Sequence, residues 1–181
     1  MSKLFDFQTN QKTIFRVVGA GDFNSFCEVE IIYYYLNNEI LLFNDILIEG
    51  IKTLQTLLNK AIEYKLVTFD LDERKGMGFL WNEYCNRLNF ENQDVDDFTS
   101  PFHLWSTDST IGIDSWIYNI DERIYLEVSP TYRWHFDEPT GADCITYEEF
   151  IAEYAPINVL EINNRTAQEW IKICEDIFDN F

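Results

Sequence analysis

The chain has 181 residues, and its 32 acidic and 13 basic residues give a formal net charge of −19. This length fits one domain, and an apolar fraction of 46% with 17% aromatic residues excludes a wholly disordered chain. Nucleic acids and anionic membranes are themselves negative, so a chain this acidic is not expected to bind either of them directly.

The first part of the chain predicts strands followed by an amphipathic helix. The β-branched run 13–18 ends at glycines and predicts a strand. The runs 27–36 and 39–43 flank Asn37 and Asn38, and asparagine tolerates the positive φ of a tight hairpin turn. The first of these two runs is also compatible with a helix. Apolar residues then recur at three- and four-residue steps over about 49–64, which predicts a helix.

The middle of the chain predicts a second hairpin. Segment 66–71 has the composition of a short strand, and the glycines of 76–78 indicate a turn. Segment 89–97 is polar and acidic, which is typical of a loop. The alternating runs 114–120 and 123–128 surround an acidic pair, and they form the clearest hairpin of the sequence.

Two capping boxes predict where the last helices begin. Thr146 and Thr166 each stand three residues before a glutamate. A threonine in this position accepts a hydrogen bond from a backbone N–H that the helix leaves free. We therefore expect helices over about 147–155 and 166–180, the second with a continuous apolar stripe.

These elements together predict one α+β domain over residues 1–181. We expect a mostly antiparallel β-sheet with about three packed helices, the last of them a C-terminal amphipathic helix. The order of the strands in the sheet does not follow from the sequence.

The sequence also indicates a cellular compartment. It opens without a basic region followed by an apolar one, and its longest apolar run, 31–36, is far shorter than the roughly 20 residues of a membrane span. We expect a cytoplasmic protein without a signal peptide or a membrane partner. The scattered cysteines (Cys27, Cys85, Cys144 and Cys174) contain no C-x-x-C pair, and we expect them to be reduced.

Residues that carry catalysis are sparse. The two histidines, His103 and His135, do not stand at a metal-binding spacing such as H-x-x-x-H. Segment 76–78 is a G-x-G without the third glycine of a dinucleotide-binding loop. No nucleophile elbow and no P-loop occurs. We expect no catalytic residue, no cofactor and no resident metal.

Two acidic clusters keep a metal-dependent enzyme open as an alternative. Asp70, Asp72 and Glu73 form the first, and the carboxylates of 94–97 form the second. Carboxylates in such clusters can hold Mg²⁺ together with substrate phosphates. A hydrolase that uses these groups, or Glu83, with a divalent metal is therefore an alternative function.

The surplus of negative charge favours a basic protein as the partner. Self-repulsion opposes compaction, whereas carboxylates raise the encounter rate with a positive surface and exclude wrong partners. Aromatic residues beside carboxylates fit the anchors of an interface with such a surface. The predicted partner-binding residues are Asp94, Asp96, Asp97, Trp105, Tyr132, Trp134, Asp137 and Glu138.

The second half of the chain contains several short motifs: S-W-I-Y-N at 115–119, Y-L-E-V-S-P-T-Y at 125–132, Y-E-E-F-I at 147–151, Y-A-P at 154–156 and E-W-I at 169–171. Their hydrophobic and turn pattern, over roughly residues 100–180, resembles the immunity proteins of bacterial polymorphic and contact-dependent growth-inhibition toxin systems. This resemblance implies a cytoplasmic protein that binds the C-terminal domain of a toxin and blocks it without catalysis. It carries over no functional residue.

The leading hypothesis is therefore a stoichiometric inhibitor that occludes the active surface of a basic toxin domain, with a nuclease as the example. Its carboxylates would pair with the cations that hold phosphates, while a Trp or Tyr fills a neighbouring pocket. The alternatives are a DNA-mimic inhibitor of nucleic-acid-binding proteins and the metal-dependent hydrolase. A mimic requires carboxylates spaced like phosphates along an extended face, whereas here the acids are dispersed among core-type residues.

Overall fold

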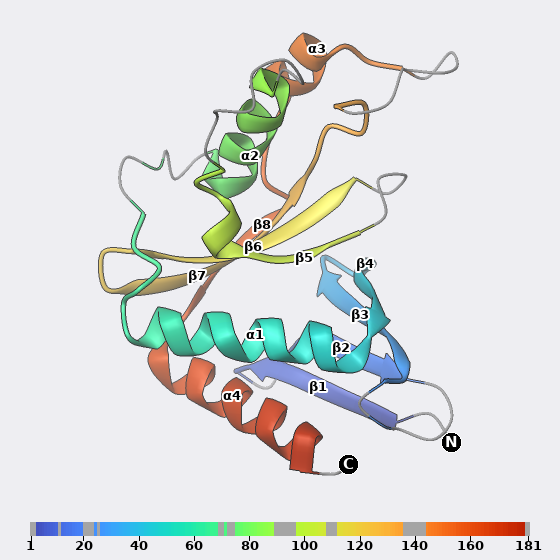
Figure 1. The fold of residues 1–181 in the computed structure, drawn as a ribbon, viewed down its shortest axis with the longest axis vertical. Helices are drawn as coiled ribbons and strands as arrows, with labels where there is room; N and C mark the ends of the chain where they lie inside the picture. Colours follow the sequence, from blue (N-terminus) through green and yellow to red (C-terminus); the bar gives the residue numbers. More distant parts are fainter. Residues whose placement is uncertain are drawn as a thin grey trace.

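The computed structural model describes residues 3–10, 12–19, 24, 26–68, 71, 75–88, 97–107, 112–135 and 144–179. Within these residues the chain forms two four-stranded antiparallel sheets and four α-helices (Figure 1). The α+β class predicted from the sequence is confirmed. The prediction of one sheet is wrong, because each half of the chain pairs its strands with their own neighbours.

The first sheet has the strand order β1–β2–β3–β4. Its strands are β1 (Lys3–Thr9), β2 (Lys12–Gly19), β3 (Glu28–Tyr35) and β4 (Asn38–Ile46). β3 and β4 confirm the predicted hairpin, and Leu36 and Asn37 between them have φ values of 47° and 67°. This left-handed backbone is the geometry of a tight hairpin turn.

The second sheet has the strand order β5–β6–β7–β8. Its strands are β5 (His103–Ser106), β6 (Ile113–Ile120), β7 (Arg123–Pro130) and β8 (Asn158–Ile162). β6 and β7 confirm the hairpin predicted over 114–128. Segment 66–71 was predicted as a strand, but its described residues form only a single parallel bridge between Val67 and Asn119.

The helices are α1 (Leu47–Ile62), α2 (Gly76–Arg87), α3 (Tyr147–Ala152) and α4 (Asn164–Asp179), with a short 3₁₀ helix η1 (Ser100–Phe102). The capping box at Thr146 is confirmed, because its hydroxyl accepts from the N–H of Glu149 and its own N–H donates to the Glu149 carboxylate. The box at Thr166 is wrong. Asn163 caps that helix by accepting from the N–H of Thr166, so α4 begins before the predicted residue.

Segment 76–78 is the first turn of α2, where the sequence analysis predicted a loop turn. Two glycines within one turn lower the intrinsic stability of a helix by roughly 1 kcal/mol each relative to alanine. The helix forms there because a carboxylate from a distant strand binds its free N–H groups, as described below.

α1 lies between the two sheets, and α4 lies beside it (Figure 1). One buried cluster continues through both sheets and both helices, and it includes Phe15, Leu54, Ile117, Leu126 and Trp170. α2 lies on the other face of the second sheet, so β6 and β7 are buried on both faces. None of the described helices has both the length and the apolar composition that crossing a bilayer requires.

The four cysteines form no disulfide. Cys85 and Cys174 are buried, and burial raises the pKa of each thiol to about 12. Both thiols are therefore protonated at neutral pH and pack as small apolar groups.

Candidate functional site

The structure does not gather the predicted partner-binding residues on one surface. Trp105 is only 2% exposed, and its indole N–H donates to the carbonyl oxygen of Gly50 at 3.0 Å. Its assignment to an interface is therefore corrected to a core role. The Asp97 carboxylate accepts from the N–H groups of Thr99 and Ser100, so it stabilises the start of η1. Four others lie outside the described residues: Asp94, Asp96, Asp137 and Glu138.

The two remaining predicted residues follow β7. The hydroxyl of Tyr132 donates to the carbonyl of Ile145 at 2.9 Å, and its ring packs against Tyr147. Trp134 is half-buried, with the guanidinium carbon of Arg133 at 5.4 Å from the centroid of its ring. Both aromatics therefore have partners within the chain.

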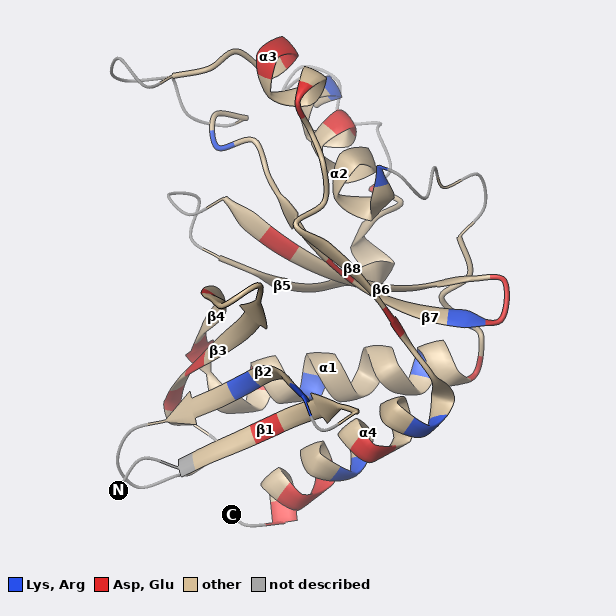
Figure 2. Cartoon of the chain, turned by 180° about the vertical axis from the view of Figure 1, so that it is seen from behind, with Lys and Arg blue, Asp and Glu red and all other residues tan. Residues whose placement is uncertain are grey.

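One face of the first sheet is left uncovered by the described helices, and we call it the open face (Figure 2). The strand register places its side chains in two rows across the sheet: Leu4, Val18, Glu30 and Asn44 in the first, and Asp6, Arg16, Ile32 and Leu41 in the second. Leu4 at the edge is 54% exposed. The opposite face is the core face, where Phe7, Phe15 and Tyr33 are buried.

A hollow of about 650 Å³ lies at one end of the open face, and its lining includes Val18, Phe26, Glu28, Glu30 and Asn44. Phe26 is 76% exposed, and none of the described residues that line the hollow is basic. Glu28 and Glu30 form no ion pair with any described residue. The hollow thus combines an exposed phenyl ring with two unpaired carboxylates.

The second row of the open face contains an ion pair between Arg16 and Asp6. Arg16 donates to the carboxylate of Asp6 at 2.9 Å, and its guanidinium carbon lies 5.6 Å from the ring centroid of Tyr34. Because Arg16 is paired in this way, it does not neutralise the carboxylates of the hollow.

The sequence did carry a signal for this hollow. Phe26 stands two residues before Glu28, and Glu28 and Glu30 alternate with Val29 and Ile31. In a strand with one buried face, that alternation places the acids together on the solvent side. Residues 26–30 therefore also show the pattern of an aromatic residue beside carboxylates, although they are not among the predicted partner-binding residues.

A smaller cleft of about 240 Å³ lies at one end of the second sheet, and we call it the Asp114 cleft. β5 and β6 supply His103 and Asp114, and α2 supplies the ring of Trp81. The remaining lining residues are Ser106, Thr107, Thr131, Tyr132 and Arg133.

Within the described part of the chain, no group lies at hydrogen-bond distance to donate to the carboxylate of Asp114. The residue is 5% exposed, and the Nε2 atom of His103 lies 3.7 Å from its Oδ2 atom, which is beyond hydrogen-bond distance. No other described residue donates to this carboxylate. The Nε2 atom of His103 is itself buried and has no partner among the described residues. The described residues thus leave this carboxylate with hydrogen-bonding capacity that a ligand in the cleft would be able to use.

Glu127, on the neighbouring strand β7, is the opposite case. It is fully buried, and it accepts hydrogen bonds from the N–H groups of Met77 (2.6 Å) and Gly78 (2.8 Å) and from the hydroxyls of Tyr118 (2.9 Å) and Ser129 (2.6 Å). Burial nevertheless raises the pKa of the carboxyl group above its usual range, because the loss of hydration outweighs these four bonds.

The two glycines of α2 make room for this carboxylate. Gly76 has φ +72°, and a Cβ atom there would clash with the carboxylate of Glu127. A Cβ atom on Gly78 would lie 2.5 Å from the Tyr154 hydroxyl, 2.6 Å from Ser129 Cβ and 3.0 Å from Glu127 Oε1. Glu127 thus occupies the helix N-terminus at which a phosphate would bind in a dinucleotide site, so the glycines of 76–78 serve the fold.

A buried amide ties α2 to the end of β7. The amide N–H₂ of Asn82 donates to the carbonyls of Gly78 (2.7 Å) and Pro130 (3.1 Å), and its Oδ1 accepts from the N–H of Tyr132 (2.7 Å). His135 Nε2 lies 3.2 Å from the same Oδ1. Burial lowers the pKa of His135 to about 4, so its ring is neutral at pH 7 and donates to Asn82 through Nε2–H.

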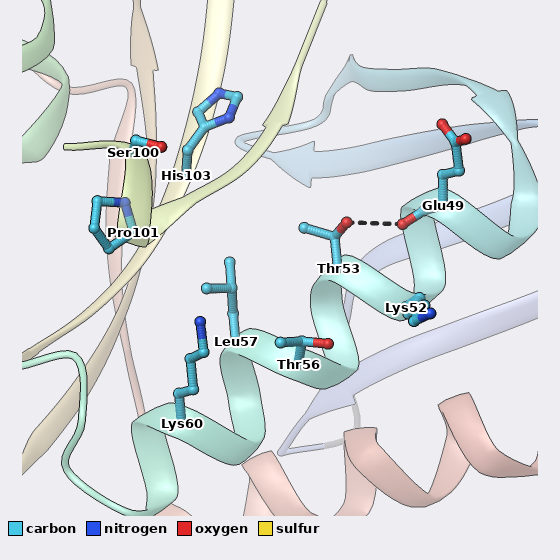
Figure 3. Close-up of a pocket in the computed structure, with 9 residues that line it drawn as sticks. All are labelled: Glu49, Lys52, Thr53, Thr56, Leu57, Lys60, Ser100, Pro101 and His103. Atoms are coloured by element: carbon cyan, nitrogen blue, oxygen red, sulfur yellow. Dashed lines mark hydrogen bonds between the residues drawn. The ribbon is translucent and has the colours of Figure 1, made fainter. Parts of the chain in front are cut away.

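A third hollow, of about 510 Å³, lies between α1 and η1 (Figure 3). Lys52 and Lys60 line it and are exposed, and the hydroxyl of Thr53 is bonded to the carbonyl of Glu49 at 2.8 Å. His103 lines both this hollow and the Asp114 cleft. Exposed lysines on a helix do not by themselves define a site.

The described residues contain no group of three or more His, Cys, Asp or Glu side chains that would hold a metal ion. Asp70, Asp72 and Glu73 lie outside the described residues, and Glu83 pairs with Arg87 at 2.7 Å. The open face and the Asp114 cleft are therefore the surfaces from which a function can be argued. Comparisons of the chain with protein-family models, with curated proteins and with solved structures found no match.

Proposed function

We propose that this protein is an acidic, non-catalytic binding protein that neutralises a basic toxin domain, in the manner of bacterial immunity proteins, and that it acts in the cytoplasm. The observation that carries the proposal is the hollow of the open face, where Phe26 is 76% exposed beside Glu28 and Glu30. The partner is a basic protein, and the open face is its docking surface.

Phe26 is suited to be an anchor of such an interface. A phenylalanine side chain that leaves water on binding contributes roughly 1.5–3 kcal/mol, and binding hot spots are aromatic groups that become fully buried. The sheet beneath it is rigid, because its other face packs in the core through Phe15 and Tyr33. Leu4 and Ile32 extend the apolar part of the same surface.

The carboxylates would determine which partner binds. No described lysine or arginine pairs with Glu28 or Glu30, so an approaching lysine or arginine gains an ion pair without breaking any of the ion pairs among these residues. The formal charge of −19 adds long-range attraction, which speeds encounter with a basic surface and weakens as salt rises.

The mechanism is occlusion. A nuclease domain holds the phosphates of its substrate with lysine and arginine side chains. If Glu28 and Glu30 pair with those cations while Phe26 fills an adjacent pocket, the substrate is excluded without any chemical step. The open face also carries aliphatic side chains such as Leu4 and Ile32 between its acids. This mixture favours one specific protein partner over a mimic of the DNA backbone.

The test uses the basic toxin-like domain encoded beside this chain as the binding partner. We expect a 1:1 complex that weakens with salt, and protection of cells that produce the toxin domain. The double variant Glu28→Lys/Glu30→Lys should lose both binding and protection. Phe26→Ala should weaken binding about thirtyfold or more, which corresponds to the loss of one hot spot.

The matched control is Glu175→Lys/Asp179→Lys on α4. Both residues are exposed and lie away from the open face. Each replacement adds two charges, so both double variants change the formal net charge from −19 to −15. Loss of binding in the open-face variant alone supports the docking surface. Equal losses in both variants, or no binding of the encoded domain by the unaltered chain, would overturn the proposal.

A further inference from the structure

We propose that the Asp114 cleft is a binding site for a guanidinium group. This site is on the second sheet and is independent of the docking surface proposed on the first. Three features support this site: a buried carboxylate to which no described residue donates, the aromatic residues that line the cleft, and the size of the cleft.

The carboxylate supplies the driving force. Asp114 is 95% covered, yet within the described part of the chain no N–H or O–H group donates to it. Arg133 lines the same cleft, but its guanidinium lies over the ring of Trp134 and no ion pair joins it to Asp114. A ligand that brings two N–H donors and a positive charge would remove the cost of this unpaired anion.

The walls of the cleft select a planar cation. Trp81 and Tyr132 line it, and a guanidinium stacks on aromatic faces while it donates in a fork to a carboxylate. A guanidinium is also more weakly hydrated than an ammonium, so less hydration is lost when it enters the cleft. The volume of about 240 Å³ admits a single side chain or a compound of that size.

The other polar groups of the cleft are consistent with this ligand. Thr107 already exchanges hydrogen bonds with the backbone of Ile113, and the Tyr132 hydroxyl is bonded to Ile145. The buried Nε2 atom of His103 has no partner among the described residues, so it is free to accept a further N–H from the ligand. Asp114 and His103 would then both be satisfied by one planar donor group.

The test is a calorimetric titration of the full chain with N-acetyl-arginine amide at low salt and pH 7.5. N-acetyl-citrulline amide serves as the neutral comparison, because it has the same length and carries a urea in place of the guanidinium. We expect the arginine compound to bind and the citrulline compound to bind at least about tenfold more weakly. Asp114→Asn should lower the affinity for the arginine compound by a similar factor.

The control variant is Asp121→Asn, which removes a carboxylate from the turn of the same hairpin. Asp121 is exposed with φ 51°, a conformation that asparagine tolerates. It should bind the arginine compound as the unaltered chain does. The variant Glu28→Lys/Glu30→Lys should also bind it normally, so failure of the cleft and failure of the docking surface are distinguishable.

Further titrations identify the source of the guanidinium and test other ligands. Tighter binding of the peptide Gly-Arg-Gly amide, with the same loss in Asp114→Asn, indicates a side chain of another protein. Equal binding of the free compound indicates a small molecule. Both results support the site. No binding of the arginine compound, equal binding of the citrulline or N-acetyl-lysine amide, or Zn²⁺ binding that requires both Asp114 and His103 would overturn it.

Discussion

Two buried carboxylates on the β6–β7 hairpin differ in how completely the chain satisfies them. Glu127 accepts four hydrogen bonds and holds the N-terminus of α2, whereas Asp114 faces a cleft with a histidine at 3.7 Å and no donor among the described residues. Both residues lie on strands that are buried on both faces. The two side chains are both buried, but only Glu127 accepts hydrogen bonds from described residues, which indicates that they have different roles.

The difference separates a carboxylate that stabilises the fold from one that is available to bind a ligand. Chains pair their buried polar groups as a rule, because each unpaired group lowers stability. Glu127 follows this rule, and its partners join α2 to the sheet. Asp114 departs from it at the edge of a cleft, which is where an external donor would be able to reach it.

The largest effect is expected when Glu127 is removed. Glu127→Ala leaves the N–H groups of Met77 and Gly78 and two hydroxyls without an acceptor in the interior, so we expect a loss of about 3–5 kcal/mol in the free energy of unfolding. Asp114→Ala should change it by less than about 1 kcal/mol, because no hydrogen bond from a described residue is broken. Urea denaturation of both variants measures the contrast, and similar losses would refute it.

A smaller loss is expected from Tyr118→Phe. This change removes one of the four donors to Glu127 and keeps the ring that packs on Tyr125. A hydrogen bond to a charged group contributes roughly 1.5–3 kcal/mol, and the other three donors keep the loss near the lower end. Tyr125→Phe is the matched control, since the described hydrogen bonds to Glu127 include that of Tyr118 but none from Tyr125. This variant should lose less stability than Tyr118→Phe. Equal losses would show that the bond to Glu127 contributes nothing.

Asp114→Asn is expected to act in the opposite direction. The amide has the same shape and carries no charge, so the hydration lost on burial is smaller and the free energy of unfolding should rise by about 0.5–1 kcal/mol. Thermal denaturation without ligand measures this gain. A clear loss of stability would mean that Asp114 is a structural residue like Glu127, and it would remove the main reason to regard its cleft as a site.

The sequence predicted the parts of this molecule that depend on local patterns. The strands of the β3–β4 and β6–β7 hairpins and the helices α1 and α3 follow from alternation, helical periodicity and the capping box at Thr146. These signals lie within a few residues of the structure they specify. The strands β1, β5 and β8 were not predicted, and each of them is an edge strand of its sheet.

The candidate sites depend on contacts between residues that are distant in the sequence, and for that reason they were harder to predict from it. α2 begins at two glycines, and the group that stabilises this start is Glu127, about 50 residues further along the chain. The burial of Asp114 likewise follows from the packing of α2 and β5 around β6, which no local pattern specifies. Trp105 was assigned to an interface by its acidic neighbours in sequence, yet in space it packs against α1.

The smallest effect is expected at His135, which lies 3.2 Å from the buried amide of Asn82. It tests whether the surroundings of Asn82 exclude water as those of Glu127 do. Burial lowers the pKa of His135 to about 4, so below pH 6.5 the unfolded chain takes up a proton that the folded chain refuses. Stability through His135 is therefore complete above pH 6.5 and falls as the pH approaches 4. Glu127 contributes with the opposite sign, because its raised pKa makes the folded chain bind a proton first as the pH falls.

The two contributions oppose each other in the same pH range, so the unaltered chain alone does not separate them. The difference in the free energy of unfolding between this chain and His135→Gln does, since Glu127 and the other carboxyl groups are common to both. We expect this difference to fall steadily from pH 6.5 to about pH 4. A difference that is independent of pH would show that His135 titrates alike in the folded and unfolded chain. Water would then reach the surroundings of Asn82. Exclusion of water beside α2 would be limited to the Glu127 carboxylate and its four donors.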